Sequence, residues 1–279
     1  MKSFKKVFSA LITPFKDSEI DYNSFRKLIE HQLRDGIQGF VINGTTAESP
    51  TLTDSEVEKL FKIAKEMVPP NITLLLGTGS NSTLKAIKDS KNAERLGAHG
   101  ALVVVPYYNK PPQRGLFEHF KAIADATQIP VILYNVPGRT ITGLEIETIK
   151  KLSEHPNIYG IKEASGNILF DKQIKIQCGD EFILLSGDDG TYEEFLEIGG
   201  HGCISVASMV IPKVILEGKT KQHKGTIDTL FIESNPIPVK YALYALGIIA
   251  SPECRLPLVT LSANNQEKVR NCLKEEGLL

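Results

Sequence analysis

Cysteines are few and scattered in this chain, which argues against a disulfide-stabilised secreted domain. The four of them, Cys178, Cys203, Cys254 and Cys272, lie far apart in the sequence and include no CxxC pair. Small secreted domains need a dense cysteine framework, whereas scattered cysteines are typical of proteins kept in a reducing compartment. We therefore expect a cytoplasmic protein.

Excess charge and long apolar runs are also missing. The formal net charge is -1, and no basic run of the kind that follows a phosphate backbone occurs, so we expect no nucleic-acid partner. The longest apolar stretches, such as residues 101–105, are far too short to cross a bilayer, so we expect no membrane partner.

The start of the chain resembles a signal peptide only faintly. Lys2, Lys5 and Lys6 precede an apolar run at residues 7–13. The run is short, ends at Pro14, and is not followed by a small-residue cleavage site. We interpret it as a first strand.

Several catalytic and cofactor motifs are absent from the sequence. It contains no Walker loop, no GxSxG elbow and no HExxH helix. Residues 77–82 begin like a dinucleotide-binding fingerprint, but Ser82 stands where the last glycine is needed. Asp188 and Asp189 are adjacent acids, yet no histidine cluster or third carboxylate accompanies them, so we predict no metal site.

The sequence does contain a repeated alternation of short apolar runs and amphipathic helical patterns. Strands are predicted at residues 7–13, 39–43, 73–76, 101–105, 131–134, 159–163, 182–185 and 203–206. Helices are predicted between them, among others at 22–34, 54–67, 83–96, 116–127, 144–152 and 192–198. Eight βα units in 279 residues predict an α/β protein with a closed (β/α)8 TIM barrel.

Three similar glycine pairs support this topology. The segments 36–39, 97–100 and 199–202 each begin and end with glycine, at the end of a predicted helix and the start of a predicted strand. Glycine is the residue best suited to the left-handed conformation that ends a helix. We predict a barrel domain over residues 1–220 and a C-terminal extension of three helices over 221–279, packed on the barrel.

Lys162 stands out because it lies on the apolar face of a predicted strand. With period-2 alternation it shares that face with Ile158, Gly160 and Ala164. Apolar surroundings favour a neutral amine, and a neutral lysine can attack a ketone to form an imine. The alternative is a structural lysine whose ammonium reaches solvent at the strand end.

Polar residues follow the predicted strands where a barrel carries its chemistry. Thr45 and Thr46 lie in a glycine- and hydroxyl-rich loop that can hold a small carboxylate, although such residues also make ordinary turns. Tyr108 belongs to a tyrosine pair that is suited to packing, an interface or proton donation. Tyr134 can pass protons near an imine, and the Arg139 guanidinium can hold a carboxylate.

Seven segments together resemble the dihydrodipicolinate synthase family of pyruvate-dependent class I aldolases. The resemblance runs in order through essentially the whole chain. The segments are GTTAES at 44–49, PYYNKP at 106–111, YNVPGRT at 134–140, GIKEASG at 160–166, LLSGDDG at 184–190, GGHGCISV at 199–206 and NPIPVK at 235–240.

The resemblance implies a lyase that condenses pyruvate with L-aspartate 4-semialdehyde through a Schiff base, on the route to diaminopimelate and lysine. Lys162 is then the imine-forming residue, and Tyr134 is the general acid/base, connected to solvent through Thr45 and Tyr108. No external cofactor is needed, because the lysine activates the carbonyl. In the family the tyrosine matching Tyr108 comes from a neighbouring subunit, which implies a homotetramer built as a dimer of dimers.

The resemblance also implies the substrate-binding residues. Thr45 and Thr46 hold the pyruvate carboxylate, Arg139 holds the carboxylate of the semialdehyde, and Gly187 and Ile204 line the pocket through their backbones. Sibling aldolases that cleave a keto-deoxy sugar acid or N-acetylneuraminate are an alternative, against which Arg139 argues. A non-catalytic binding barrel is a second alternative, against which the complete set of site residues argues.

Three positions depart from the lysine-inhibited members of the family. Asp54, Val57 and Lys85 fall where those members carry two histidines and a glutamate. We therefore expect feedback inhibition by lysine to be weak or absent.

Overall fold

The computed structural model describes residues 4–279, so Lys2 of the signal-like stretch lies outside the described residues. The chain forms two compact units. One consists mainly of Thr73–Ile204, and the other consists of Val7–Ile72 and Ser205–Leu279. The predicted boundary between barrel and extension at residue 220 stays a prediction.

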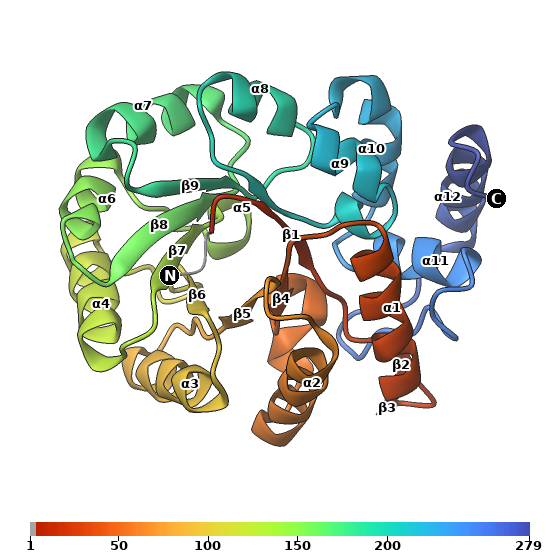
Figure 1. The fold of residues 1–279 in the computed structure, drawn as a ribbon, viewed down its shortest axis with the longest axis horizontal. Helices are drawn as coiled ribbons and strands as arrows, with labels where there is room; N and C mark the ends of the chain where they lie inside the picture. The colour runs from red at the N-terminus through yellow and green to blue at the C-terminus, as the bar shows by residue number, and fades with distance from the viewer. Residues whose placement is uncertain (1–3) are drawn as a thin grey trace. The chain divides into compact units, whose positions relative to one another are not determined.

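The unit around Thr73–Ile204 contains parallel strands with helices between them (Figure 1). Its strands are β5 (Thr73–Gly77), β6 (Gly100–Val104), β7 (Val131–Asn135), β8 (Ile158–Glu163), β9 (Ile183–Ser186) and the start of β10 (Cys203–Ser205), each paired in parallel with the next. Its helices are α3 (Thr83–Leu96), α4 (Gln113–Ala126), α5 (Pro137–Thr140), α6 (Ile146–Ser153), α7 (Ile168–Cys178) and α8 (Tyr192–Glu197).

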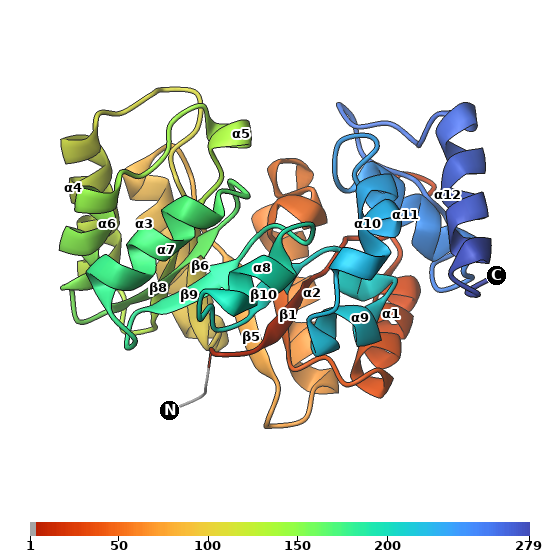
Figure 2. The ribbon, with the colours of Figure 1, turned by 90° about the horizontal axis from the view of Figure 1, so that it is seen from above.

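The other unit joins the first part of the chain to the last. Its strands are β1 (Val7–Ala10) and β4 (Gly39–Ile42), which pair in parallel, and the short antiparallel pair β2 (Phe15–Lys16) and β3 (Glu19–Ile20). Its helices are α1 (Tyr22–Arg34), α2 (Asp54–Met67), α9 (Pro212–Glu217), α10 (Lys224–Leu230), α11 (Ile237–Ala245) and α12 (Ala263–Glu275). Single 3-10 turns lie at Thr45–Ala47, Ser49–Thr51, Ala207–Met209 and Lys221–His223. Figure 2 shows α10, α11 and α12 gathered together.

The eight parallel strands form a closed barrel in the order β1-β10-β9-β8-β7-β6-β5-β4. This confirms the predicted (β/α)8 fold, and the first apolar run is a strand as interpreted. Parallel strands covered by helices are buried on both faces, so their sequences are continuous apolar runs. In β7, for example, Val131, Ile132 and Leu133 are all fully buried.

Local chemistry fixes several helix ends. Thr53 and Glu56 form a capping box at the start of α2, with the Thr53 side chain accepting from the Glu56 N–H and the Glu56 carboxylate accepting from the Thr53 N–H. At the end of α3, Gly97 has a φ of 82°, which places it in the left-handed region that favours glycine. The Gly97 conformation follows the sequence prediction.

The helix α7 is not one of the helices named from the sequence, and its burial pattern gives it a weak sequence signal. Leu169 and Ile176 are 75% and 67% exposed, whereas Asp171 is buried. The apolar residues therefore do not all lie on the face that packs against the rest of the unit. The hydrophobic periodicity that predicts an amphipathic helix is weak as a result. Among residues 4–279, no helix combines the length and apolar character needed to cross a membrane.

Candidate active site

Lys162 and Tyr134 lie side by side at the C-terminal ends of two neighbouring strands. Both are the next-to-last residues of their strands, and they pair in the register of β7 and β8. The Lys162 Nζ atom lies 4.3 Å from the centre of the Tyr134 ring, and both residues are only 7% exposed. The structure thus brings together the predicted nucleophile and the predicted acid/base.

The space beside Lys162 exists because residue 187 is glycine. A Cβ atom at Gly187 would lie 2.7 Å from the Lys162 Cε atom and 2.6 Å from the Ala164 Cβ atom, both too close for real contacts. The Gly187 N–H also donates to the Glu163 carbonyl at 2.6 Å, which ties the end of β9 to the end of β8. Any side chain at this position would push the amine out of its place.

Asn135 and Glu163 form a hydrogen bond that the sequence analysis missed. They follow Tyr134 and Lys162 directly and pair in the same register. The Asn135 Nδ2 atom donates to Glu163 Oε2 at 2.6 Å, and Asn135 Oδ1 accepts from the Leu144 N–H at 2.9 Å. Burial raises the pKa of Glu163. The pair holds the two strands together immediately behind the lysine and tyrosine.

Asp171, on α7, adds a second buried carboxyl close to Glu163. Its Oδ1 atom has no hydrogen-bond partner among residues 4–279, and the residue is 3% exposed. Burial, followed by the negative charges of Glu163 and Asp188, raises its pKa to about 7. A carboxyl in such a place is harder to ionise in the folded protein than in the unfolded chain.

We expect Asp171→Asn to stabilise the protein above pH 7 and to have little effect near pH 4. The folded state holds the Asp171 proton up to about pH 7, whereas the unfolded chain releases it near its ordinary value of 3.8. The contribution of Asp171 to the free energy of unfolding is therefore fully present below about pH 4, and it is lost as the pH rises to about 7. The expected gain is on the order of 2–4 kcal/mol, measured by urea unfolding across this pH range.

Asp180→Asn is the matched control, because Asp180 is an exposed acid whose ion pair with Lys175 lowers its pKa. The control should give no gain in stability at high pH. Equal stability of the wild type and Asp171→Asn at pH 8 would contradict the expectation.

Arg139 and Tyr108 lie on loops that follow β7 and β6. Arg139 is an exposed residue of the short helix α5, two positions before Ile141, which has a φ of 66°. Tyr108 is 84% exposed and has a φ of 75°, a conformation rare for a side chain of this size. Their roles in the site stay predictions.

Ile204, on β10, is 2% exposed and follows the fully buried Cys203. Burial raises the pKa of the Cys203 thiol, and the nearby Asp189 raises it further. Burial also raises the pKa of Tyr192, the hydrogen-bond partner of Cys203. Because a neutral thiol is a poor nucleophile, Cys203 is a packing residue rather than a reactive one.

Thr45 and Thr46 lie in the other unit, on the 3-10 turn Thr45–Ala47 that follows β4. Thr46 is 3% exposed, and its hydroxyl accepts a hydrogen bond of 3.0 Å from Asn235 Nδ2. The turn is also held by the Thr13 hydroxyl, which donates to the Ala47 carbonyl at 2.8 Å. The joint geometry of the two threonines with Lys162 stays a prediction.

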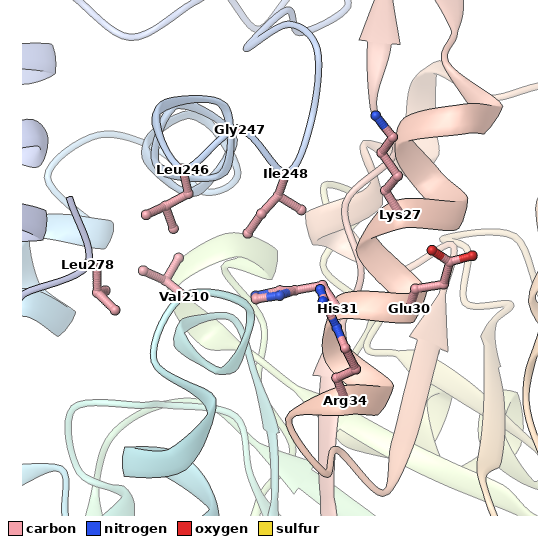
Figure 3. Close-up of a pocket in the computed structure, with 9 residues that line it drawn as sticks. All are labelled: Lys27, Glu30, His31, Arg34, Val210, Leu246, Gly247, Ile248 and Leu278. Carbon is pink, nitrogen blue, oxygen red and sulfur yellow. The ribbon is translucent and has the colours of Figure 1, made fainter.

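A cavity of about 460 Å³ lies in the same unit but contains none of the predicted site residues. Figure 3 shows the His31 ring directed between Val210 and Ile248, with charged residues of α1 beside it. The lining consists of Lys27, Glu30, His31, Arg34, Val210, Leu246, Gly247, Ile248 and Leu278.

The barrel and the buried lysine–tyrosine pair define the class of the protein. It is a (β/α)8-barrel enzyme with an amine at the C-terminal ends of its strands, where such barrels carry their chemistry. The model of the dihydrodipicolinate synthetase family matches residues 3–276. The chain belongs to this family.

Individual relatives agree with this assignment over their full length. The 4-hydroxy-tetrahydrodipicolinate synthase of Bdellovibrio bacteriovorus is 53% identical over 293 residues, with all of both chains covered. The crystal structure of dihydrodipicolinate synthase from Thermotoga maritima matches with a TM-score of 0.94 at 40% identity and covers 98% of each chain. The Acinetobacter baumannii enzyme, whose structure is complexed with pyruvate, matches with a TM-score of 0.92 at 41% identity and covers 98% of this chain and 99% of its own.

Proposed function

We propose that the protein condenses pyruvate with L-aspartate 4-semialdehyde to give 4-hydroxy-tetrahydrodipicolinate, in the biosynthesis of diaminopimelate and lysine. The observation that carries the proposal is the buried Lys162 amine 4.3 Å from the Tyr134 ring, in a chain of the dihydrodipicolinate synthetase family. The cytoplasm is the proposed location, supported by four free cysteines.

The proposed reaction begins at the Lys162 amine. Its nitrogen attacks the pyruvate ketone, water leaves, and an imine forms whose positive nitrogen draws electrons from the neighbouring methyl group. Loss of a methyl proton gives an enamine, which forms a carbon–carbon bond to the semialdehyde carbon and leaves a hydroxyl there. The amine of the second substrate then attacks the imine carbon, closes the ring and releases Lys162.

In this proposal Tyr134 moves the protons. Its hydroxyl is a suitable general acid/base because Tyr134 packs against the Lys162 side chain at the reacting end of the strands. Thr45 and Tyr108 connect Tyr134 to solvent as a proton relay. Each step then needs only side chains of the protein and no external cofactor or metal.

Two sets of residues bind the substrates in this proposal. The hydroxyls of Thr45 and Thr46 hold the pyruvate carboxylate, and Arg139 holds the carboxylate of the semialdehyde. Gly187 and Ile204 line the pocket through their backbones. The close fit of Gly187 beside the Lys162 Cε atom supports its place in this lining.

The function is tested by comparing two activities of the purified protein. Condensation of pyruvate with L-aspartate 4-semialdehyde should be rapid, whereas cleavage of keto-deoxy sugar acids or of N-acetylneuraminate should be slower by several orders of magnitude. Preferred cleavage of a sugar acid would assign the protein to a sibling aldolase, and no activity in either assay would favour a binding barrel.

We expect Arg139→Ala to impair use of the semialdehyde far more than imine formation with pyruvate. Loss of a charge-assisted hydrogen bond lowers the catalytic efficiency toward the semialdehyde by roughly 10- to 150-fold. Steady-state kinetics in both substrates and borohydride trapping of pyruvate measure the two effects. An equal loss in both half-reactions would instead make Arg139 a structural residue.

A homotetramer, arranged as a dimer of dimers, is the proposed assembly. Leu84, Tyr108 and Ile141 are 81%, 84% and 70% exposed in the single chain and form candidates for one interface. Leu169 and Ile176, seven residues apart on α7, lie on one helix face and form a candidate for the second. Analytical ultracentrifugation tests this assembly, and a monomer at micromolar concentration would refute it.

We expect L-lysine at millimolar concentration to inhibit the enzyme weakly or not at all. Lys85 places an exposed ammonium at this position, paired with Asp89 at 2.9 Å. Its positive charge disfavours binding of a second ammonium at close range. Asp54 and Val57 lack the imidazole rings of the lysine-inhibited members. Steady-state rates and calorimetry with lysine measure the effect. Saturable inhibition with a constant below about 1 mM, that is a binding free energy stronger than about 4 kcal/mol, would contradict the expectation.

Lys85→Glu is the informative variant for this expectation. The change removes the repulsion but restores neither imidazole, so we expect it to recover little inhibition. Strong inhibition of Lys85→Glu would show that one charge accounts for the whole difference.

A further inference from the structure

Asn235 reaches from the C-terminal part of its unit to the threonine turn. It stands two residues before the start of α11, and its Nδ2 atom donates to the Thr46 hydroxyl oxygen at 3.0 Å. Asn235 and Thr46 are 7% and 3% exposed, so water competes little for this bond. A donor therefore faces one lone pair of the threonine hydroxyl.

The direction of this bond decides what the Thr46 hydroxyl can do. A hydroxyl has one proton to donate and two lone pairs that accept. Because the Asn235 amide fills one lone pair, the hydroxyl proton points to a different partner. A carboxylate accepts hydrogen bonds only, so it is the ligand that this arrangement fits.

The backbone of the turn is held by other residues. The Thr13 hydroxyl donates to the Ala47 carbonyl at 2.8 Å, and the Arg255 N–H donates to Glu48 Oε2 at 2.8 Å. Glu48 also forms a fully buried ion pair with Lys240. These anchors remain when Asn235 is changed, so the Asn235 side chain acts on the Thr46 hydroxyl rather than on the path of the chain.

We propose that Asn235 is a positioning residue that fixes the Thr46 hydroxyl as a hydrogen-bond donor to the carboxylate of pyruvate. The proposal rests on the proposed function, in which Thr46 binds that carboxylate. Asn235 itself need not touch the substrate. It acts by preventing the threonine proton from turning toward the protein.

The first test is Asn235→Ala. Loss of one oriented hydrogen bond should raise the KM for pyruvate by about 3- to 10-fold and leave kcat within about twofold, because the contact is made equally in ground state and transition state. Asn265→Ala is the matched control, since Asn265 also donates an amide hydrogen bond in the C-terminal segment, to Glu233 at 2.7 Å. The control should leave both constants unchanged. A fall in kcat with unchanged KM for Asn235→Ala would overturn the proposal.

A double-mutant cycle separates action through Thr46 from a general structural effect. Thr46→Val should raise the KM for pyruvate, and adding Asn235→Ala to it should raise the KM no further, because the hydroxyl to be positioned is already gone. If the KM of the double variant instead rises by the product of the two single increases, Asn235 acts elsewhere. An unchanged KM in Thr46→Val would also refute the proposal.

Asn235→Asp tests the direction of the bond. An ionised carboxyl accepts the Thr46 proton and repels the substrate carboxylate, whereas a protonated carboxyl donates as the amide does. An aspartate is ordinarily ionised at about pH 8, so the KM for pyruvate of this variant should exceed that of Asn235→Ala there. Asn265→Asp should leave the KM unchanged. A KM of Asn235→Asp equal to or below that of Asn235→Ala would mean that the residue does not set the hydroxyl direction.

The failure of this proposal can be told apart from failure of the proposed function. Borohydride reduction of the wild type with pyruvate reports imine formation at Lys162 without any contribution from Asn235. A missing adduct refutes the proposed function and the role of Asn235 with it. If the adduct is normal but the Asn235 and Thr46 variants raise the KM independently, only the proposed role of Asn235 is refuted.

Discussion

Lys162→Arg is expected to abolish the covalent adduct that pyruvate and borohydride form on the wild-type protein. Arginine keeps the positive charge and is slightly longer than lysine, but at physiological pH its guanidinium offers no free amine to attack a ketone. In the wild type, borohydride should reduce the imine and add the mass of a reduced pyruvyl group to the peptide that contains Lys162. Condensation activity of the variant should fall by at least about 1,000-fold, as expected for loss of a nucleophile.

Lys172→Arg is the matched control for this experiment. Lys172 is an exposed lysine on α7, ten positions along the chain from Lys162. This variant should trap pyruvate and turn over like the wild type. A labelled peptide that lacks Lys162, or trapping retained in Lys162→Arg, would refute the assignment of the imine-forming residue.

The barrel and its lysine could be predicted from the sequence because both depend on short-range patterns. The alternation of apolar runs with amphipathic helices marks each βα unit locally. Likewise, the neighbours that surround Lys162 on its strand, Gly160 and Ala164, are only two residues away. Strand periodicity alone then places the amine among small side chains.

The supports of the site could not be predicted in the same way, because they depend on contacts between distant segments. No local pattern pairs Asn135 with Glu163, although both directly follow predicted site residues. Gly187 could be predicted only through a family resemblance. The physical reason for a glycine there, the closeness of the Lys162 Cε atom, becomes visible only in the folded structure. The weak periodicity of α7 has a similar cause, since its buried Asp171 and exposed Leu169 invert the usual pattern.

The C-terminal segment was predicted as three helices without a role, and the structure connects it to the threonine turn. Asn235 and Lys240, both in the segment NPIPVK, contact Thr46 and Glu48 of the segment GTTAES. Glu48 has a φ of 57°, a left-handed conformation unusual for glutamate, which directs the chain out of the turn. The two segments are therefore one structural element made of opposite ends of the chain.

The strongest connection in this element is the ion pair between Glu48 Oε1 and Lys240 Nζ, whose side chains are both 0% exposed. The Lys240 ammonium also donates to the Glu253 carbonyl at 2.7 Å and lies 4.2 Å from the centre of the Phe15 ring. Burial lowers the pKa of Lys240, and the charge of Glu48 opposes this shift. The lysine is therefore surrounded, in a fully buried site, by groups that stabilise its charged form.

We expect Lys240→Met to destabilise the protein by about 3–5 kcal/mol, because it leaves the Glu48 carboxylate buried and uncompensated. Methionine has nearly the length of lysine, so the loss reflects charge more than packing. Urea unfolding at equal protomer concentration measures the change. Lys62→Met is the matched control: Lys62 pairs with Glu58 at 2.7 Å on the surface of the same unit, with 58% of the lysine side chain exposed. Such an exposed pair contributes about 0–1 kcal/mol.

The double variant Lys240→Met with Glu48→Gln decides whether charge is the cause. A neutral glutamine keeps the shape of Glu48 and can still accept from the Arg255 N–H, so most of the stability lost in Lys240→Met should return. If the double variant loses as much unfolding free energy as the two single variants together, the loss comes from packing around Lys240 instead. Because the turn carries Thr45 and Thr46, the KM for pyruvate should rise in Lys240→Met and recover together with stability in the double variant.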